Sequence, residues 1–420
     1  MTGLLFGVFI LALALGVPIA FSILLSSIAV LYAGNIPLMV IPQRMFASVD
    51  SFPLIAVPFF IFAGDLLARG AMSRRLVNFA DSMIGRVRGG LSIVAVAASM
   101  LFASMSGSGA ATTAVSSTTL IPQLKERGYK VEESAALIAA AGTIGIVFPP
   151  SVAMVLYAVI AAESVAGLFR NGFLPGFLMG FTLMGIALYQ AYKNNYPQSD
   201  KFSFANLWRT FRKAIWVLLM PVILLVGIFE GTFTPSEAAV VAVVYAIAVS
   251  AIIYRDLTFK ELYRVMANSA KTTSVIMIII ACSGAFGWVL ANWQLPQRFA
   301  AQVLAFSENP FVVMALIAVM ILAFGLFMEP ASAIIILTPV FLPLVMGLGI
   351  NLIHFGLVIV VGNAVGKIIP PVAINLFVAS SVTGLPLEKI SRSVVPYIIG
   401  LTIIFLLVVF APMFFPGLII

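Results

Sequence analysis

The residues GTIGIVFPPS, at positions 142–151, interrupt an apolar segment that runs over residues 134–162. Tandem prolines remove backbone N–H donors and clash with the preceding turn, so a helix through this segment must open before Pro149. The residues GNAVGKIIPP, at 362–371, interrupt a second apolar segment, 352–382, in the same way. Because carbonyl groups freed by such breaks cannot face lipid, they must line a cavity or bind a ligand.

A constant shift of 221 residues relates the two interrupted segments. Applied without gaps, it aligns four sets of helix breakers: Pro122 with Pro343, Gly128 with Gly349, Gly145 with Gly366, and Pro149-Pro150 with Pro370-Pro371. Such matches carry more information than matches between apolar residues, which are frequent in this composition. We therefore interpret the chain as two related halves, as in many secondary transporters.

Two further apolar segments, 91–121 and 311–347, are too long for one crossing, which needs about 20 residues. Each is interrupted in the middle, by SMSGSGAATT at 104–113 and by FMEPAS at 327–332, and we interpret both as re-entrant hairpins. Since cytoplasmic loops carry an excess of Lys and Arg, the first should open to the cytoplasm and the second, which lacks basic flanks, to the outside. The basic residues that flank the first hairpin are Arg86, Arg88, Lys125, Arg127 and Lys130.

The composition indicates a membrane protein. Of the 420 residues, 62% are hydrophobic and 9% charged, whereas soluble domains have about 45–50% apolar and about 25% charged residues. The net charge of +8 comes from short basic clusters between apolar runs, a pattern typical of cytoplasmic loops and not of nucleic-acid binding. The single cysteine, Cys282, excludes an internal disulfide, and we expect an inert buried thiol.

The chain carries no recognisable processing or enzyme signature. The apolar run 4–33 is too long for a signal peptide and has no basic segment before it, so we interpret it as two short spans that meet at Gly16-Val17-Pro18. Walker loops for ATP, metal-spaced His or Cys sets and nucleophile elbows are absent from the sequence. An ATP-driven pump or an enzyme is therefore not favoured.

These features predict an all-α polytopic membrane protein, built as an inverted repeat with two re-entrant hairpins and two broken helices. We expect ten full spans besides the hairpins, and both termini outside. The first repeat covers 1–192, a cytoplasmic and partly amphipathic linker covers 193–213, and the second repeat covers 214–420. Residues 234–237, TPSE, should begin a helix through a capping box.

The breaks also suggest chemistry. Gly, Ser and Thr present carbonyl and hydroxyl oxygens that suit a cation such as Na⁺. Helix N-termini at the hairpin tips present N–H groups and a partial positive charge that suit a carboxylate. Proline kinks and small-residue packing are the alternative interpretation, but four breaks in two matching pairs favour a transport site.

Four ionisable residues lie in or beside the apolar segments, and two of them have more than one interpretation. Lys367 lies in an apolar span, where an ammonium is expected to be functional or paired. It could contact a substrate carboxylate, replace a cation, or extend into water. Glu329 could bind a cation, carry a proton or, most simply, cap the following helix. We expect Asp65 at the level of the lipid headgroups and His354 as an interfacial residue at the outer edge of a span.

Several short motifs occur in a fixed order along the chain. In the first half they are LGVPIAF at 15–21, SFPLIAVPFFIFAGD at 51–65, RGGL at 88–91, SGSGAA at 106–111, IP at 121–122, RGY at 127–129, PPS at 149–151 and LPG at 174–176. In the second half they are FTPSEAA at 233–239, YRDLT at 254–258, HFG at 354–356, PP at 370–371 and NLF at 375–377. In these motifs the chain resembles, over nearly its whole length, the large membrane subunit of TRAP (tripartite ATP-independent periplasmic) transporters of the C4-dicarboxylate and sialic acid type.

The resemblance implies an elevator-type symporter of the bacterial inner membrane, in which a mobile domain carries both hairpins past a scaffold. It implies Na⁺ as coupling ion, no other cofactor, and a C4-dicarboxylate, sialic acid or similar organic acid as substrate. It also implies two partners, a small four-helix membrane subunit and a periplasmic substrate-binding protein.

The resemblance further implies the site residues. Sodium ligands would come from Ser106, Gly107, Ser108, Gly142, Thr143, Gly145, Val147, Pro149, Glu329, Ser332, Gly362, Asn363, Gly366 and Ile368. The substrate would lie between the two tips, at Ser108, Gly109, Ala331 and Lys367.

Three positions depart from the family pattern. The family usually has Ser or another small residue at Gly109, a neutral residue at Lys367, and often Thr at Ile369. We hypothesise that the second site binds fewer Na⁺, or that the substrate carries an extra negative charge that Lys367 meets.

Three rival functions stay open. One is a carboxylate/sodium symporter that needs no binding protein. Another is an ion channel or antiporter, against which stand the paired tips and the scarcity of intramembrane carboxylates. The third, a membrane enzyme, is disfavoured because no catalytic set is present.

Overall fold

The computed structural model describes residues 1–420 except 69, 84–86, 199–202, 371–372 and 420. Within the described residues the elements are all helices, and the only β-type pairing is an isolated bridge between Arg88 and Gln198. The predicted all-α fold is therefore confirmed. Arg86 and Pro371, which entered the predictions of the first hairpin and the repeat, lie outside the described residues.

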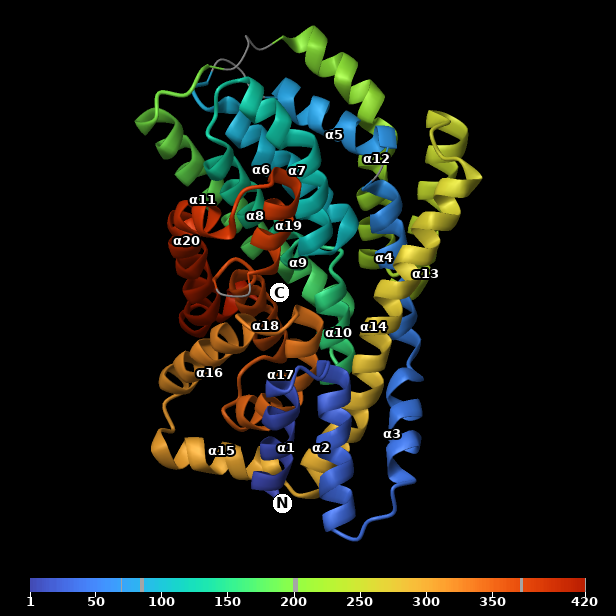
Figure 1. Ribbon diagram of the computed structural model, residues 1–420, viewed down its shortest axis with the longest axis vertical. Coiled ribbons are helices and arrows are strands. Elements are labelled where there is room, and N and C mark those ends of the chain that lie inside the picture. Colours follow the sequence, from blue (N-terminus) through green and yellow to red (C-terminus); the bar gives the residue numbers. More distant parts are fainter. Residues whose placement is uncertain (69, 84–86, 199–202, 371–372, 420) are drawn as a thin grey trace.

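The helices divide as follows (Figure 1). The first half contains α1 (Thr2–Ala14), α2 (Ile19–Ala33), α3 (Val40–Val49), η1 (Phe52–Ile55), α4 (Ala56–Leu67), α5 (Gly70–Met83), α6 (Gly90–Ser106), α7 (Gly109–Glu126), α8 (Val131–Gly142), α9 (Ile144–Val147), α10 (Val152–Ala161) and α11 (Val165–Lys193). The second half contains α12 (Phe204–Phe229), α13 (Pro235–Ala248), η2 (Val249–Tyr254), α14 (Phe259–Asn292), α15 (Leu295–Phe306), α16 (Pro310–Gly325), α17 (Pro330–Gly347), α18 (Leu352–Gly366), α19 (Ile374–Thr383), α20 (Leu387–Phe414) and η3 (Pro416–Leu418).

The helix bounds recur at the shift that aligned the prolines. Shifting α7 by 221 residues gives 330–347, which are the bounds of α17, and shifting α11 gives 386–414, one residue longer than α20. The region shifted onto α14 holds α3 and α4 instead of one helix, and these are bent by 67°. Pro53 stands at that bend, and its counterpart is Ser274, which allows α14 to continue.

The two hairpins enter from opposite ends of the molecule. The helices α6 and α7 lie in the upper part of Figure 1, and α16 and α17 lie in the lower part. Gly107, between α6 and α7, has φ +57°, a conformation that favours glycine. A Cβ there would also lie 2.9 Å from the carbonyl oxygen of Pro150, so the first tip packs tightly on the break before α10.

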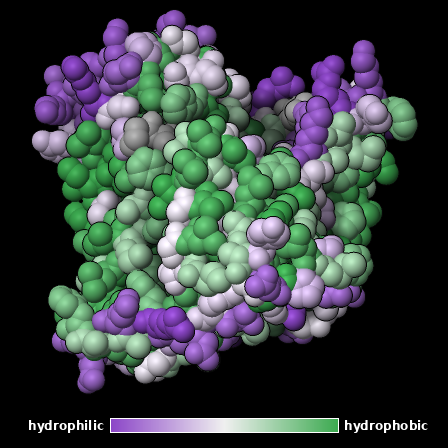
Figure 2. All heavy atoms as spheres, turned by 60° about the horizontal axis from the view of Figure 1, so that its bottom comes forward, coloured by the Kyte–Doolittle hydropathy of each residue, from purple (hydrophilic) through white to green (hydrophobic). Residues whose placement is uncertain are grey.

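The described residues contain fewer spanning helices than the ten predicted. Seven helices are long and apolar enough to cross a membrane, or eight if α3 and the bent segment after it count as one span. The helices α1 and α2 have 13 and 15 residues, short of the about 20 that a crossing needs. Figure 2 shows the apolar surface between hydrophilic residues that gather toward the ends of the molecule.

The prediction did not include the amphipathic helices α5 and α15, which lie at opposite ends of the molecule (Figure 1). In α5 the buried side chains recur every three to four residues, at Met72, Leu76, Val77 and Ala80. Within the linker predicted at 193–213, α12 begins at Phe204 and continues without a break into the apolar segment.

Single-residue predictions had mixed outcomes. The capping box of Thr234 and Glu237 is present, and Cys282 is buried. The interfacial position predicted for His354 is wrong. Its side chain is 3% exposed, and its Nε2 lies 2.9 Å from the carbonyl oxygen of Val408 in α20. The helix that packs on this face is distant in sequence, which is why local sequence did not predict the burial.

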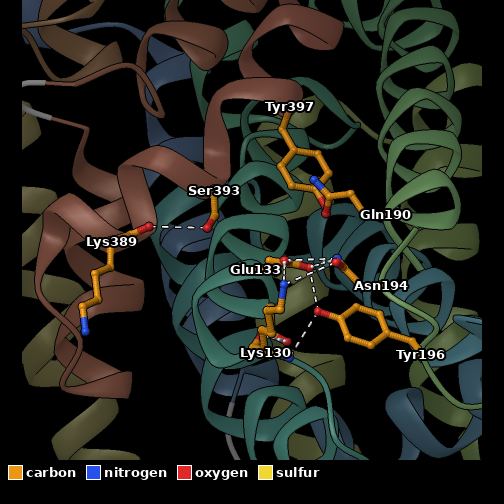
Figure 3. Close-up of polar contacts among 9 residues, drawn as sticks. Lys130, Glu133, Gln190, Asn194, Tyr196, Lys389, Ser393 and Tyr397 are labelled. Carbon is orange, nitrogen blue, oxygen red and sulfur yellow. Dashed lines mark hydrogen bonds and ion pairs between the residues drawn. The ribbon is translucent and has the colours of Figure 1, made fainter. Parts of the chain in front are cut away.

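A polar cluster around Glu133 fixes the end of α11 to the start of α8 (Figure 3). The Glu133 carboxylate accepts hydrogen bonds from the Tyr196 hydroxyl at 2.6 Å, from Asn194 Nδ2 at 2.9 Å and from Lys130 Nζ at 3.0 Å. Burial, together with the bond to Glu133, raises the pKa of the Tyr196 phenol. The cluster therefore anchors the start of the segment between α11 and α12 to α8.

Replacing Glu133 by Gln should lower the midpoint of thermal unfolding in detergent. The charged acceptor of three hydrogen bonds is lost, and hydrogen bonds to charged groups contribute about 1.5–3 kcal/mol. The matched control is Glu132→Gln, which removes the same charge from the same turn of α8. Equal midpoints for the two variants would contradict a stabilising role for the Glu133 cluster.

Candidate functional site

A cavity of about 460 Å³ lies where the two hairpin tips meet. Its wall includes residues 106–111 of the first tip and 329–331 of the second. The helices α4, α9, α10, α14 and α19 and Lys367 at the end of α18 complete the wall. The fold thus brings together, around one cavity, segments that lie far apart in the sequence.

The predicted substrate residues all line this cavity. They are Ser108, Gly109, Ala331 and Lys367. Of the predicted sodium residues, Ser106, Gly107, Ser108 and Glu329 also line it. The others are buried and are not among its lining residues: Gly142, Thr143, Gly145, Val147, Pro149, Ser332, Gly362, Asn363, Gly366 and Ile368.

Oxygen atoms converge at the first tip. The hydroxyl of Ser106 lies 2.8 Å from that of Thr112 and 3.3 Å from the carbonyl oxygen of Ser108. Gly145 packs against this group, since a Cβ there would lie 2.7 Å from the Ser108 carbonyl oxygen and 2.6 Å from Thr112 Oγ1. Because such oxygens suit a cation, this tip could hold Na⁺ against α9. Thr112 was not among the predicted ligands.

The first tip also presents a helix N-terminus to the cavity. The Ser108 hydroxyl caps α7 by accepting a hydrogen bond from the backbone N–H of Ala111 at 3.5 Å. Ser108, Gly109 and Ala110 all line the cavity. The partial positive charge of this helix end therefore acts on whatever occupies the cavity.

The second tip has the same plan with different side chains. Glu329 caps α17, its Oε2 accepting a hydrogen bond from the backbone N–H of Ala331 at 2.9 Å, which confirms the capping interpretation. Behind the tip, Gly366 of α18 packs on the end of α16. A Cβ at Gly366 would lie 2.7 Å from the carbonyl carbon of Gly325, so only a glycine fits this contact.

Asn363, one turn earlier on α18, has a free oxygen beside this contact. Its Nδ2 donates to the carbonyl oxygen of Ile359 at 2.7 Å. Its Oδ1 is buried and has no hydrogen-bond partner among the described residues. An unsatisfied buried acceptor is costly, and a bound cation would satisfy it. The residue is therefore a fitting ligand for a second Na⁺.

Two residues of opposite charge distinguish the second half from the first. Lys367 is 4% exposed, and Glu329 is exposed where it lines the cavity. The two charges interact electrostatically. Their counterparts at the shift of 221 are Ser108 for Glu329 and Ile146 for Lys367, and both of these also line the cavity. Charge is thus added on one side of an otherwise matched site.

Three polar residues of the wall escaped prediction: Asp65, Thr272 and Asn375. Asp65, expected at the level of the headgroups, lines the cavity, and its Oδ2 accepts a hydrogen bond from Ser269 of α14 at 2.6 Å. The sequence feature that could have indicated a site residue was the position of this carboxylate near the end of an apolar segment. The sequence did not show that α4 and α14 face the hairpin tips.

A model of one protein family matches residues 6–414, and it is described as the tripartite ATP-independent periplasmic transporter, DctM component. The chain belongs to this family. It is therefore a large permease subunit of a TRAP transporter, an integral protein of the inner membrane and not an enzyme.

Curated relatives of this TRAP permease cover most of its length. It is 40% identical to the C4-dicarboxylate TRAP transporter large permease protein DctM of Pseudomonas aeruginosa, over 88% of this chain and 86% of that protein. It is 37% identical to the 2,3-diketo-L-gulonate TRAP transporter large permease protein YiaN of Escherichia coli, over 95% of this chain and 94% of that protein. It is 38% identical to the isethionate TRAP transporter permease protein DctMQ of Oleidesulfovibrio alaskensis over 98% of this chain, but the match spans only 66% of that protein.

One solved structure supports the fold of the permease. The Alcanivorax borkumensis YdaH transporter, described as having an unusual topology, superimposes with a TM-score of 0.66. The match covers 89% of this chain and 88% of that transporter, with 16% sequence identity. At this identity the likeness concerns the fold alone.

Proposed function

We propose that this permease imports an organic acid by sodium symport, together with a small membrane subunit and a periplasmic binding protein that delivers the acid. The family description supports the tripartite assembly. The relatives named for C4-dicarboxylates and for 2,3-diketo-L-gulonate support a carboxylate substrate. The observation that carries the proposal is the single cavity between two capped hairpin tips and Lys367.

The cavity suits a small anion. Ligand cavities of about 300–1,000 Å³ are usual for small molecules, and this one has about 460 Å³. The N-terminus of α7, which carries no capping carboxylate, and the Lys367 ammonium supply positive potential to the cavity. We infer that Lys367 pairs with a substrate carboxylate. This assignment is favoured over replacement of the second Na⁺, because Lys367 lines the cavity whereas Asn363 and Gly366 lie behind it.

The proposed ion sites would couple Na⁺ binding to binding of the acid. One Na⁺ would sit among Ser106, Ser108 and Thr112 beside Gly145, and the other at Asn363 beside the Gly325–Gly366 contact. In each place the ion would join a hairpin tip to its neighbouring broken helix. The tips then hold their substrate-binding geometry only when the ions are bound, which makes sodium binding favour substrate binding.

The proposed movement is that of an elevator. The cavity wall combines both hairpins with α4 and α14, which pack on each other. We propose that α4 and α14 belong to the scaffold. The mobile domain would consist of the first hairpin (α6 and α7), the helices α8 to α11, the second hairpin (α16 and α17) and the helices α18 to α20. The cavity would then lie at the boundary along which the mobile domain slides.

Uptake into proteoliposomes tests the proposal. The vesicles hold the permease and its small subunit, with the binding protein and labelled acid outside, and with or without an inward Na⁺ gradient. We expect uptake only when both the binding protein and the gradient are present. Uptake without the binding protein would indicate a plain symporter, and uptake indifferent to Na⁺ would contradict the sodium sites. Proton or Na⁺ exchange without acid uptake would indicate an antiporter.

A further inference from the structure

A second cavity, of about 230 Å³, lies between α5 and α12. It is separate from the cavity at the hairpin tips, and its lining residues in the described part of the chain are all polar or charged: Arg75, Asn78, Asp81, Asn206, Arg209, Thr210 and Lys213. Among these described residues, three cations accompany one carboxylate, which gives them a net positive charge. The positive charge and polar lining of this cavity favour an anionic ligand.

The walls of this cavity are held in place by other contacts. The Arg75 guanidinium lies over the ring of Tyr254, 3.5 Å from its centroid, and the Tyr254 hydroxyl donates to the carbonyl oxygen of Lys213 at 2.9 Å. The hydroxyls of Ser82 and Thr210, 2.6 Å apart, join α5 to α12. The cavity is therefore a built feature of the contact between these two helices.

Arg75 has an unused donor at this place. Its Nη1 is buried and has no hydrogen-bond partner among the described residues. Buried donors are nearly always paired, and an acceptor that entered the cavity lined by Arg75 would supply a partner. Guanidinium groups bind phosphate oxygens with two parallel hydrogen bonds, and Arg75 and Arg209 both line this space.

The position of the cavity indicates the source of the phosphate. The helices α5 and α12 begin at the end of the molecule shown uppermost in Figure 1. On α12, the neighbouring Phe204 and Trp208 are 71% and 54% exposed. Exposed aromatic side chains beside a basic cluster are typical of the headgroup level of a membrane. We propose that this cavity binds the phosphate group of an anionic membrane lipid.

Such a lipid would act on the contact between α5 and α12. The helix α5 follows α4 of the cavity wall and precedes α6 of the first hairpin. A headgroup held by Arg75 of α5 and by Arg209 and Lys213 of α12 would tie the two helices together. Lipid binding should therefore stabilise the permease without occupying the transport cavity.

Binding of phosphatidylglycerol to the full chain in detergent tests the proposal, by native mass spectrometry and by the shift in thermal midpoint. Wild-type protein should retain phosphatidylglycerol in preference to phosphatidylcholine. Arg209→Gln should weaken the retention by about tenfold, which corresponds to about 1.4 kcal/mol. The matched control, Arg212→Gln, removes the same charge from the same helix but outside the cavity, and it should retain wild-type affinity.

Three outcomes would overturn the proposal. Equal losses in Arg209→Gln and Arg212→Gln would show general attraction to basic residues. Full retention of phosphatidylglycerol by Arg75→Gln would show that the unused donor plays no part. The same thermal shift with millimolar inorganic phosphate would show a free-anion site. If Arg209→Gln does not fold, Lys213→Gln replaces it, because Lys213 is exposed and lines the same cavity.

Discussion

Replacing Lys367 by Met should lower uptake at limiting concentrations of loaded binding protein by about tenfold or more. A charged hydrogen bond contributes about 1.5–3 kcal/mol, and each 1.4 kcal/mol is about tenfold in affinity. The number of Na⁺ ions carried per acid should stay unchanged, because Lys367 lines the substrate cavity and Asn363 lies behind it. Parallel measurement of ²²Na⁺ and labelled acid uptake gives both quantities.

Two control variants separate binding from stability. Lys260→Met removes an exposed lysine from α14 and should leave uptake unchanged. Removing Lys367 alone also leaves the Glu329 carboxylate without its nearby opposite charge. The double variant Lys367→Met/Glu329→Gln should therefore regain thermal stability but not uptake. Normal affinity with an altered Na⁺ ratio would contradict the assignment and place Lys367 at the second sodium site.

Replacing Gly145 by Ala should reduce Na⁺-driven uptake by about tenfold to a hundredfold. The added Cβ would lie 2.7 Å from the backbone carbonyl oxygen of Ser108, which is closer than a Cβ normally approaches a non-bonded atom. The first tip must therefore move away from α9. Overpacking of this kind costs about 1–3 kcal/mol. We expect the loss as a higher Na⁺ concentration for half-maximal uptake, and Gly366→Ala should act in the same way at the second tip.

The matched control for both glycines is Gly185→Ala. Gly185 lies within α11 and has open space where its Cβ would be. Alanine there should be neutral or stabilise the protein, by about 0.4–1 kcal/mol. A normal Na⁺ dependence in Gly145→Ala would contradict the idea that contact between tip and broken helix forms an ion site.

Local sequence features predicted the centre of the fold well. The hairpins and the break before Pro149 follow from proline chemistry and from residues that cannot continue a helix, both of which act within a few residues. The breaks predicted backbone that lines a cavity, and the family resemblance supplied the substrate residues expected there. Ser108, Gly109, Ala331 and Lys367 accordingly meet in one place.

Features that depend on distant contacts were not predicted. Nothing near His354 in the sequence indicates that Val408 will cover it. The sequence near Asp65 suggested a position at the headgroups. Its place beside the cavity depends on the packing of α4 against α14 and the first tip, which local sequence does not show. The ten predicted spans included apolar runs as short as α1 and α2, which have 13 and 15 residues, fewer than the length criterion for a crossing.

The central claim is that the cavity between the tips is the substrate site. Thiol labelling at the first hairpin tip tests this claim most directly. Ala110 is exposed and lines the cavity, and the only cysteine of the sequence, the buried Cys282, can be replaced by Ser to give a clean background. In this background Ala110→Cys is treated with a membrane-impermeant maleimide, and Gln302→Cys, exposed on α15, is the control.

We expect labelling of Ala110→Cys to abolish uptake, and Na⁺ together with the acid to slow the labelling severalfold. The control should be labelled without loss of uptake and without protection. Full uptake by a permease labelled at Ala110→Cys would contradict the account, because it would show that the acid crosses without passing between the hairpin tips.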